Sequence, residues 1–164
     1  MKKIISIIIL CLFGTILLVA CGKQEVEKPS QTTMIGNPWS SWDTIQEAES
    51  AVGFAFGLPE VLADSYEAGT IRTLNDKLIE VVYYCGDFKV CVRKQEGEGQ
   101  DISGDYNQYE TCREESYNGG TIANYHNSTN NAVKLIISYN GYSWSVVAPE
   151  GYSDLDLVSM ICEE

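Results

Sequence analysis

Residues 133–148 read VKLIISYNGYSWSVVA, two alternating segments on either side of Asn140-Gly141. Asn and Gly both tolerate the positive φ angles of a type I′ turn, so this dipeptide is a strong hairpin signal. The turn sets the apolar side chains of the two segments opposite one another: Val133 with Ala148, Leu135 with Val146, Ile137 with Trp144, and Tyr139 with Tyr142. Because turn and alternation agree, the stretch predicts an antiparallel hairpin with one buried face.

A second two-residue turn, Gly86-Asp87, predicts another hairpin, between residues 78–85 and 88–94. It places Val81 opposite Val92, Tyr83 opposite Val90, and Glu80 opposite Arg93. A looser turn at 75–77 adds a strand at 71–74 and brings Arg72 beside Glu80 as well. Cross-strand pairs of opposite charge support this register. The three segments form a predicted meander.

Further strands are expected at residues 109–115 and 121–125. Their register is left open, because Gly119-Gly120 and the Asn-rich run 127–131 allow several turns.

Two helices are expected to flank the strands. Thr44 and Glu47 form a capping box that starts the first helix, and Gly53 ends it. Trp39 and Trp42 precede this helix and are expected to pack under its start rather than to bind a ligand. Pro59 interrupts regular structure in residues 54–60. A terminal helix opens with Ser153 and Asp156, and its apolar side consists of Leu155, Val158, Ile161 and Cys162.

This order of elements predicts an α+β fold: an antiparallel meander with an N-terminal and a C-terminal helix covering one face. Residues 38–164 form a single domain in this interpretation, since their number suits one hydrophobic core. The formal net charge of the whole chain is −12. Such acidity excludes nucleic acid as a partner and disfavours adhesion of the domain to anionic lipid.

The N-terminal segment resembles a bacterial lipoprotein signal. Lys2 and Lys3 precede an apolar run from Ile4 to Ala20, which ends at Cys21. The resemblance implies that residues 1–20 are removed and that Cys21 becomes a lipidated N-terminus, which anchors the protein to the outer face of the cytoplasmic membrane. The alternative is an uncleaved transmembrane helix, for which the run lies at the lower edge of the required length.

Residues 21–37 are polar and aperiodic, which predicts a flexible tether behind the lipid-bearing cysteine. A coil of this length reaches about 20–25 Å, so the domain would stay close to the membrane surface.

Several blocks of the sequence resemble a domain of unknown function from secreted or lipid-anchored proteins of Firmicutes, also seen in the extracytoplasmic parts of anti-sigma-type regulators. The resemblance covers residues 36–160 but departs from the pattern in 112–131. It implies no activity and no site residues. The blocks are 36–39 (GNPW), 43–49 (DTIQEAE), 79–83 (IEVVY), 92–94 (VRK) and 101–107 (DISGDYN), of which ISGDYN is the most specific.

Residues with catalytic or metal-binding chemistry are few. His126 is the single histidine of the chain and is expected to be a surface residue, so a catalytic triad would depend on it alone. Asp101, Ser103, Asp105 and Asn107 carry oxygen atoms of the kind that calcium binds. Asp101 and Asp105 are therefore weak metal candidates. However, Gly104 stands fourth from Asp101 rather than sixth, so the EF-hand pattern fails. A tight turn with side-chain capping is the alternative, and no cofactor is expected.

Four cysteines follow Cys21 in the expected domain: Cys85, Cys91, Cys112 and Cys162. The second hairpin points Cys85 and Cys91 to opposite faces, so a bond between these two is not expected. We predict Cys91 with Cys112, on neighbouring strands, and Cys85 with Cys162. The alternative is four buried thiols, which a reducing environment would preserve.

The ten tyrosines and Trp144 suit either a core and half-buried sheet or an aromatic platform for carbohydrate or peptide. The absence of a nucleophile–base pattern favours a non-enzymatic, lipid-anchored module that binds a protein, peptide or envelope ligand. The alternatives are a sensory or regulatory component of envelope signalling and, third, a cell-wall enzyme.

Overall fold

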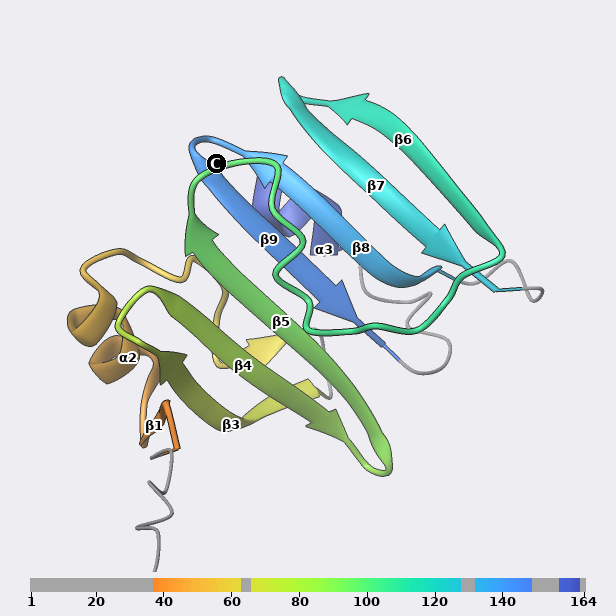
Figure 1. Cartoon of the computed structure of the whole chain (residues 1–164). Helices are drawn as coiled ribbons and strands as arrows, with labels where there is room; N and C mark the ends of the chain where they lie inside the picture. Colours follow the sequence, from red (N-terminus) through yellow and green to blue (C-terminus); the bar gives the residue numbers. More distant parts are fainter. Residues whose placement is uncertain (1–36, 63–65, 128–131, 149–156, 163–164) are drawn as a thin grey trace, which may run out of the picture. The chain divides into compact units, whose positions relative to one another are not determined.

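The computed structural model describes residues 37–62, 66–127, 132–148 and 157–162 (Figure 1). Residues 1–36, which comprise the expected signal, Cys21 and all but the last residue of the expected tether, lie outside these ranges, as does the expected helix start at Ser153. Within the described residues, no helix has the length and apolarity needed to cross a bilayer.

The described part of the chain forms one antiparallel sheet of nine strands and two short helices. The elements are β1 (Trp39–Trp42), α2 (Ile45–Val52), β2 (Val61–Leu62), β3 (Tyr66–Leu74), β4 (Leu78–Cys85), β5 (Phe88–Glu96), β6 (Thr111–Tyr117), β7 (Gly120–His126), β8 (Ala132–Tyr139), β9 (Tyr142–Val147) and α3 (Leu157–Cys162).

Both predicted hairpins are confirmed with their registers. β4 and β5 pair Val81 with Val92 and Glu80 with Arg93, while β3 places Arg72 opposite Glu80. β8 and β9 pair Ile137 with Trp144. The side chain of Val133 lies outside the described residues.

The strand order is β1-β3-β4-β5-β9-β8-β7-β6, with β2 beside β3. Two meanders therefore meet at the β5–β9 pair, and three strands lie between β5 and β6. The long β5–β6 loop (residues 97–110) makes this order possible, because it crosses in front of β9 and β8 before the chain enters β6 (Figure 1). The expectation that Cys91 and Cys112 occupy neighbouring strands is therefore wrong.

The register that the sequence left open is set by Asn118-Gly119. These residues have φ angles of 45° and 84°, like the 51° and 83° of Asn140-Gly141. β6 and β7 thus form a third hairpin with a two-residue turn, which pairs Tyr117 with Gly120.

The capping box of α2 is confirmed: Glu47 N donates to Thr44 Oγ1 at 3.3 Å, and Thr44 N donates to the Glu47 carboxylate at 3.3 Å. Gly53 ends the helix with a φ of 85°. The two tryptophans before it lie in strand β1, which the sequence did not predict. Trp42 packs against the core and donates its Nε1 proton to Thr73 Oγ1, 3.0 Å away.

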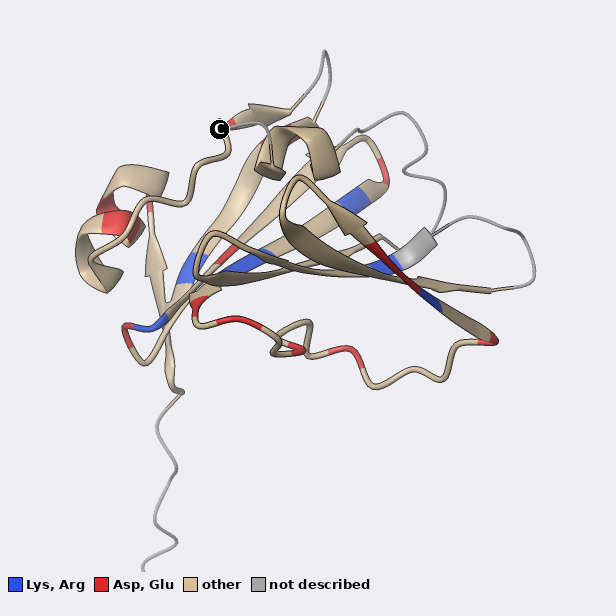
Figure 2. Ribbon diagram, turned by 90° about the horizontal axis from the view of Figure 1, so that it is seen from above, with Lys and Arg blue, Asp and Glu red and all other residues tan. Residues whose placement is uncertain are grey.

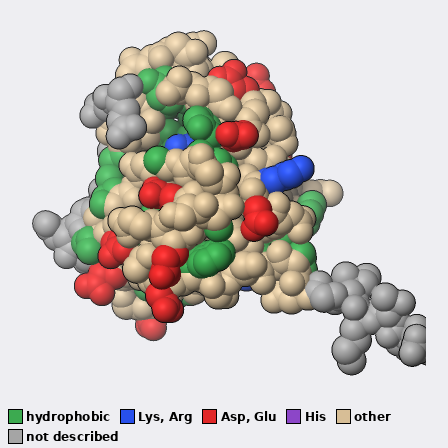
Figure 3. Space-filling view, turned by 90° about the vertical axis from the view of Figure 1, so that its left-hand side faces the viewer, with side chains coloured by type: hydrophobic (Ala, Val, Ile, Leu, Met, Phe, Trp, Pro, Cys, Tyr) green, Lys and Arg blue, Asp and Glu red, His purple; other side chains and the backbone are tan. Residues whose placement is uncertain are grey.

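The hydrophobic core lies on one face of the sheet. Its strand members alternate, as Val81 and Tyr83 on β4 and Val90 and Val92 on β5 do, and all four are at most 1% exposed. The opposite face carries Glu80, Arg93 and other polar side chains, and the β5–β6 loop crosses it. In Figure 2 a row of acidic residues follows this loop, other acidic residues lie on α2 and on strands, and most basic residues lie on the strands. Figure 3 shows that acidic groups predominate on the side of β1 and α2 as well.

Candidate ligand-binding face

The β5–β6 loop is fastened to the sheet at its first residues. Gly99 N donates to Ser138 Oγ at 2.9 Å, and Gln100 N donates to Ser143 Oγ at 3.1 Å. The Ser143 hydroxyl in turn donates to the carbonyl of Gly97 at 2.7 Å. Ser143 is fully buried, so these bonds satisfy polar groups that water does not reach. The loop is therefore a fixed part of this face.

Beneath the loop, Glu80 is only 1% exposed and binds two arginines. Its Oε1 lies 2.5 Å from Arg72 Nε, and its Oε2 lies 2.7 Å from Arg93. Burial alone would raise the pKa of the Glu80 carboxyl, but the hydrogen bonds and charges of Arg72 and Arg93 hold that pKa below its usual value. Trp39 lies over Arg72, whose guanidinium carbon is 4.1 Å from the ring centre.

Arg93 connects this ion cluster to the loop. Its Nη1 donates to the carbonyl of Ile102 at 2.9 Å. Gly104 packs directly on the same guanidinium, and a Cβ at this position would lie 3.1 Å from Arg93 Cζ, with Nη1 closer still. Gly104 also has a φ of 62°, which L side chains rarely adopt. The glycine of the ISGDYN string is therefore required by close approach as well as by backbone conformation.

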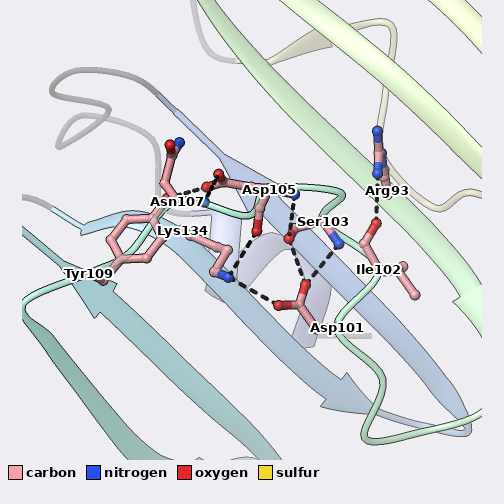
Figure 4. A network of polar contacts seen from close by, with 8 residues as sticks. All are labelled: Arg93, Asp101, Ile102, Ser103, Asp105, Asn107, Tyr109 and Lys134. Atoms are coloured by element: carbon pink, nitrogen blue, oxygen red, sulfur yellow. Dashed lines mark hydrogen bonds and ion pairs between the residues drawn. The ribbon is translucent and has the colours of Figure 1, made fainter.

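The second attachment is Lys134 on β8, a buried lysine beneath the loop (Figure 4). Its Nζ lies 3.0 Å from Asp101 Oδ2 and 3.5 Å from the carbonyl of Asp105. It also lies 4.3 Å from the ring centre of Tyr125 and 5.2 Å from that of Tyr109. Burial opposes ionisation of Asp101, yet its bonds with Ser103 and Lys134 keep its pKa below the usual value.

The expected side-chain capping of the turn is confirmed. Asp101 accepts protons from the backbone and hydroxyl of Ser103, at 3.0 and 2.6 Å. Ser103 Oγ accepts from Asp105 N at 3.1 Å, and Asp105 accepts from Asn107 N at 3.0 Å and from the Tyr109 hydroxyl. Each side chain thus satisfies a backbone group two residues along the chain.

The two weak metal candidates use their carboxylates separately. Asp101 binds Lys134 and Ser103, whereas Asp105 binds Asn107 and Tyr109. Within the described residues, the positively charged group that binds the Asp101 carboxylate and the Asp105 carbonyl is the ammonium group of Lys134. In the described ranges, no three His, Cys, Asp or Glu residues are grouped as metal ligands would be.

Tyr106 differs from its neighbours in this network. It is 95% exposed, whereas Ile102 is 9% and Ser103 is 4% exposed. Its backbone is held on both sides by the capping bonds of Asp105. A rigid loop thus presents an aromatic side chain to solvent, an arrangement typical of recognition sites.

A cavity of about 260 Å³ lies between the loop and the sheet, and Asp105 and Asn107, the residues on either side of Tyr106, help to line it. Its lining residues are Lys89, Cys91, Ser103, Gly104, Asp105, Asn107 and Val147. Cys91 is the one thiol among them, and burial together with the charge of Glu80 raises its pKa to about 12. Because the thiolate is the nucleophilic form, this raised pKa keeps the Cys91 thiol protonated at neutral pH. The one thiol of the cavity is therefore not activated.

All four cysteines of the domain are free thiols in the structure. Cys85 and Cys91 point to opposite faces, as expected. The predicted Cys91–Cys112 pair is excluded by the strand order, because β9, β8 and β7 lie between the two residues. The Cys85–Cys162 pair is not formed. Burial raises the pKa of the Cys162 thiol, which favours the protonated form.

His126 lies at the end of β7 with part of its surface exposed, and no described residue bonds its Nδ1.

Two lysines were not predicted from the sequence, because both stand in strands where a charged side chain is expected to be exposed to solvent. Lys134 holds the loop, and Lys94 lies on the core face, 4.5 Å from the ring centre of Trp144. Its Nζ donates to the carbonyl of Ala55 at 2.7 Å. The alternation of polar and apolar residues could have shown that Lys94 shares a face with Val92.

The comparisons give no family. No protein-family model, curated protein or solved structure matches this chain. The geometry of the loop-covered face is therefore the basis for the function proposed below.

Proposed function

We propose that this protein is a lipid-anchored, extracytoplasmic binding module, and that a protein, peptide or envelope ligand contacts Tyr106 and the adjoining cavity. The observation that carries the proposal is the 95% exposure of Tyr106 on a loop whose neighbouring residues are bonded or packed. Aromatic side chains on fixed loops supply large contact areas at a low entropic cost.

The chemistry of the cavity supports binding over catalysis. Its thiol is held in the protonated form, its carboxylate at Asp105 is bonded to Tyr109 and Asn107, and Lys89 is its cation. We further propose that α2 and α3 cover the apolar face of the sheet, as expected from the sequence. This arrangement leaves the loop-covered face for the ligand.

The anchor is tested by replacing Cys21 with serine in the full chain. We expect Cys21→Ser to lose incorporation of labelled palmitate and to release most of the protein from the membrane fraction, because serine offers no thiol for diacylglyceryl transfer. Cys112→Ser, which removes an exposed thiol, should change neither property. Retention of unlabelled Cys21→Ser protein in the membrane would instead support an uncleaved transmembrane helix.

The binding surface is tested with a photo-reactive phenylalanine analogue at position 106 of the full chain in its native host. We expect irradiation to give a discrete higher-mass adduct, because the side chain at 106 points away from the fold. Val61, which is 53% exposed on β2, provides the control position and should give none. Asn107→Ala should reduce the adduct yield at 106. Equal adducts at 61 and 106, or none at 106, would contradict the proposal.

A further inference from the structure

The β6 edge of the sheet is long and open. Six of the seven residues of β6 are exposed, and no described strand lies beyond it. At the opposite end of the sheet, β1 has only four residues. Since a strand edge presents unpaired N–H and C=O groups, β6 offers hydrogen bonds to another strand.

The third hairpin determines which residues of β6 offer these bonds. In a two-residue hairpin, the residues that flank the turn exchange both hydrogen bonds, here Tyr117 and Gly120. The bonding residues alternate along the strand, so Arg113 and Glu115 also bond to β7. Cys112, Glu114 and Ser116 therefore direct their backbone N–H and C=O groups outward.

We propose that two copies of this chain associate through antiparallel pairing of their β6 strands, with Glu114 on the two-fold axis. In this register, Cys112 and Ser116 of opposite copies are hydrogen-bonded partners, as are the two Glu114 residues. Arg113 of each copy then lies opposite Glu115 of the other. These are non-hydrogen-bonded positions, whose side chains approach most closely, so two symmetric ion pairs form.

The sequence of β6 selects this register over its neighbours. A shift of two residues in one direction sets Arg113 against Arg113, and a shift in the other sets Glu115 against Glu115. A shift of one residue places the outward N–H and C=O groups of one copy opposite residues of the other copy whose N–H and C=O groups are already bonded to β7. Such a register cannot form the hydrogen bonds of a strand pair. The centred register alone pairs all seven residues and matches unlike charges. One Glu115 oxygen accepts from Asn124 Nδ2 at 2.9 Å, which leaves its second oxygen for the arginine.

The first test is a charge exchange, with the full chain in density-matched detergent and the dimer measured by sedimentation equilibrium. Arg113→Glu and Glu115→Arg should each weaken association by roughly tenfold, because each turns two attractive pairs into repulsive ones. The double variant should restore the wild-type dissociation constant. Glu114→Gln should tighten the dimer, because it removes the like charges at the axis. A wild-type monomer at all concentrations, or a double variant no better than the singles, would overturn the proposal.

The second test fixes the register by cysteine cross-linking. In a Cys112→Ser background, Glu114→Cys should form a disulfide-linked dimer under mild oxidation, since residue 114 faces itself. Ser116→Cys in the same background is the matched control and should not cross-link, because it faces position 112 of the other copy, where this background has no thiol. Cross-linking at 116 but not at 114 would overturn the centred register, and a monomer that pairs with a different protein would overturn self-association.

Discussion

Replacing Glu80 with alanine is expected to lower the free energy of unfolding by about 3–5 kcal/mol, the usual result of removing one partner from a buried ion cluster. Glu80 is 1% exposed, and the side chains of Arg93 and Arg72 are 16% and 35% exposed. Without the carboxylate, Arg93 would keep a charge beneath the loop, and its hydrogen bond to the carbonyl of Ile102, at 2.9 Å, would not neutralise that charge. Urea unfolding followed by tryptophan fluorescence measures the loss.

The effect of Glu80→Ala should depend on pH. The folded-state pKa of Glu80 is lower than its unfolded value of about 4.5, so the carboxylate stabilises the fold fully above that value. This contribution is lost as the pH falls through the lower, folded-state pKa. The difference in stability between wild type and Glu80→Ala should therefore be largest near neutral pH and shrink in strong acid.

Glu67→Ala is the matched control, because Glu67 is an exposed carboxylate on the neighbouring strand β3. Its substitution should change the free energy of unfolding by less than about 0.5 kcal/mol. A Glu80→Ala protein as stable as the control, or a stability difference that does not change between neutral pH and strong acid, would show that the ion cluster does not stabilise the fold.

The sequence could predict what depends on local chemistry. Asn140-Gly141 and Gly86-Asp87 set their own hairpins, because a two-residue turn and the alternation beside it act over a few residues. Asn118-Gly119 carries the same signal, but the adjacent Gly119-Gly120 allows a turn one residue later, so the sequence alone leaves this register open. The β5–β9 pairing could not be predicted in this way, since no turn connects those strands.

The same distinction applies to the candidate site. The capping bonds of Ser103 and Asp105 are local, and the sequence predicted them, whereas the capping bond of Asp101 was not predicted. The contacts of the loop with Arg93 and Lys134 depend on where the loop crosses the sheet, which is a non-local property. The predicted Cys91–Cys112 bond was wrong for this reason, because it assumed that strands consecutive in sequence are neighbours in the sheet.

Replacing Gly104 with alanine is expected to lower the free energy of unfolding by about 2–4 kcal/mol, the sum of an unfavourable positive φ and a displaced charged hydrogen bond. The added methyl group would overlap Arg93 Nη1 and lie 3.1 Å from Cζ. A free arginine could move aside, but Glu80 and the carbonyl of Ile102 hold this one. The loop would therefore have to lift from the sheet, which should also increase hydrogen exchange in residues 101–107.

An Arg93→Lys background separates the two causes of that loss. Lysine keeps a positive charge near Glu80 but lacks the planar group that Gly104 packs against. There, Gly104→Ala should cost only the backbone contribution, about 1–2 kcal/mol. An equal cost in both backgrounds would mean that the φ of 62° alone requires glycine. A smaller cost beside lysine would identify Arg93 as the residue against which the ISGDYN loop is fitted, and so as the residue that fixes the position of Tyr106.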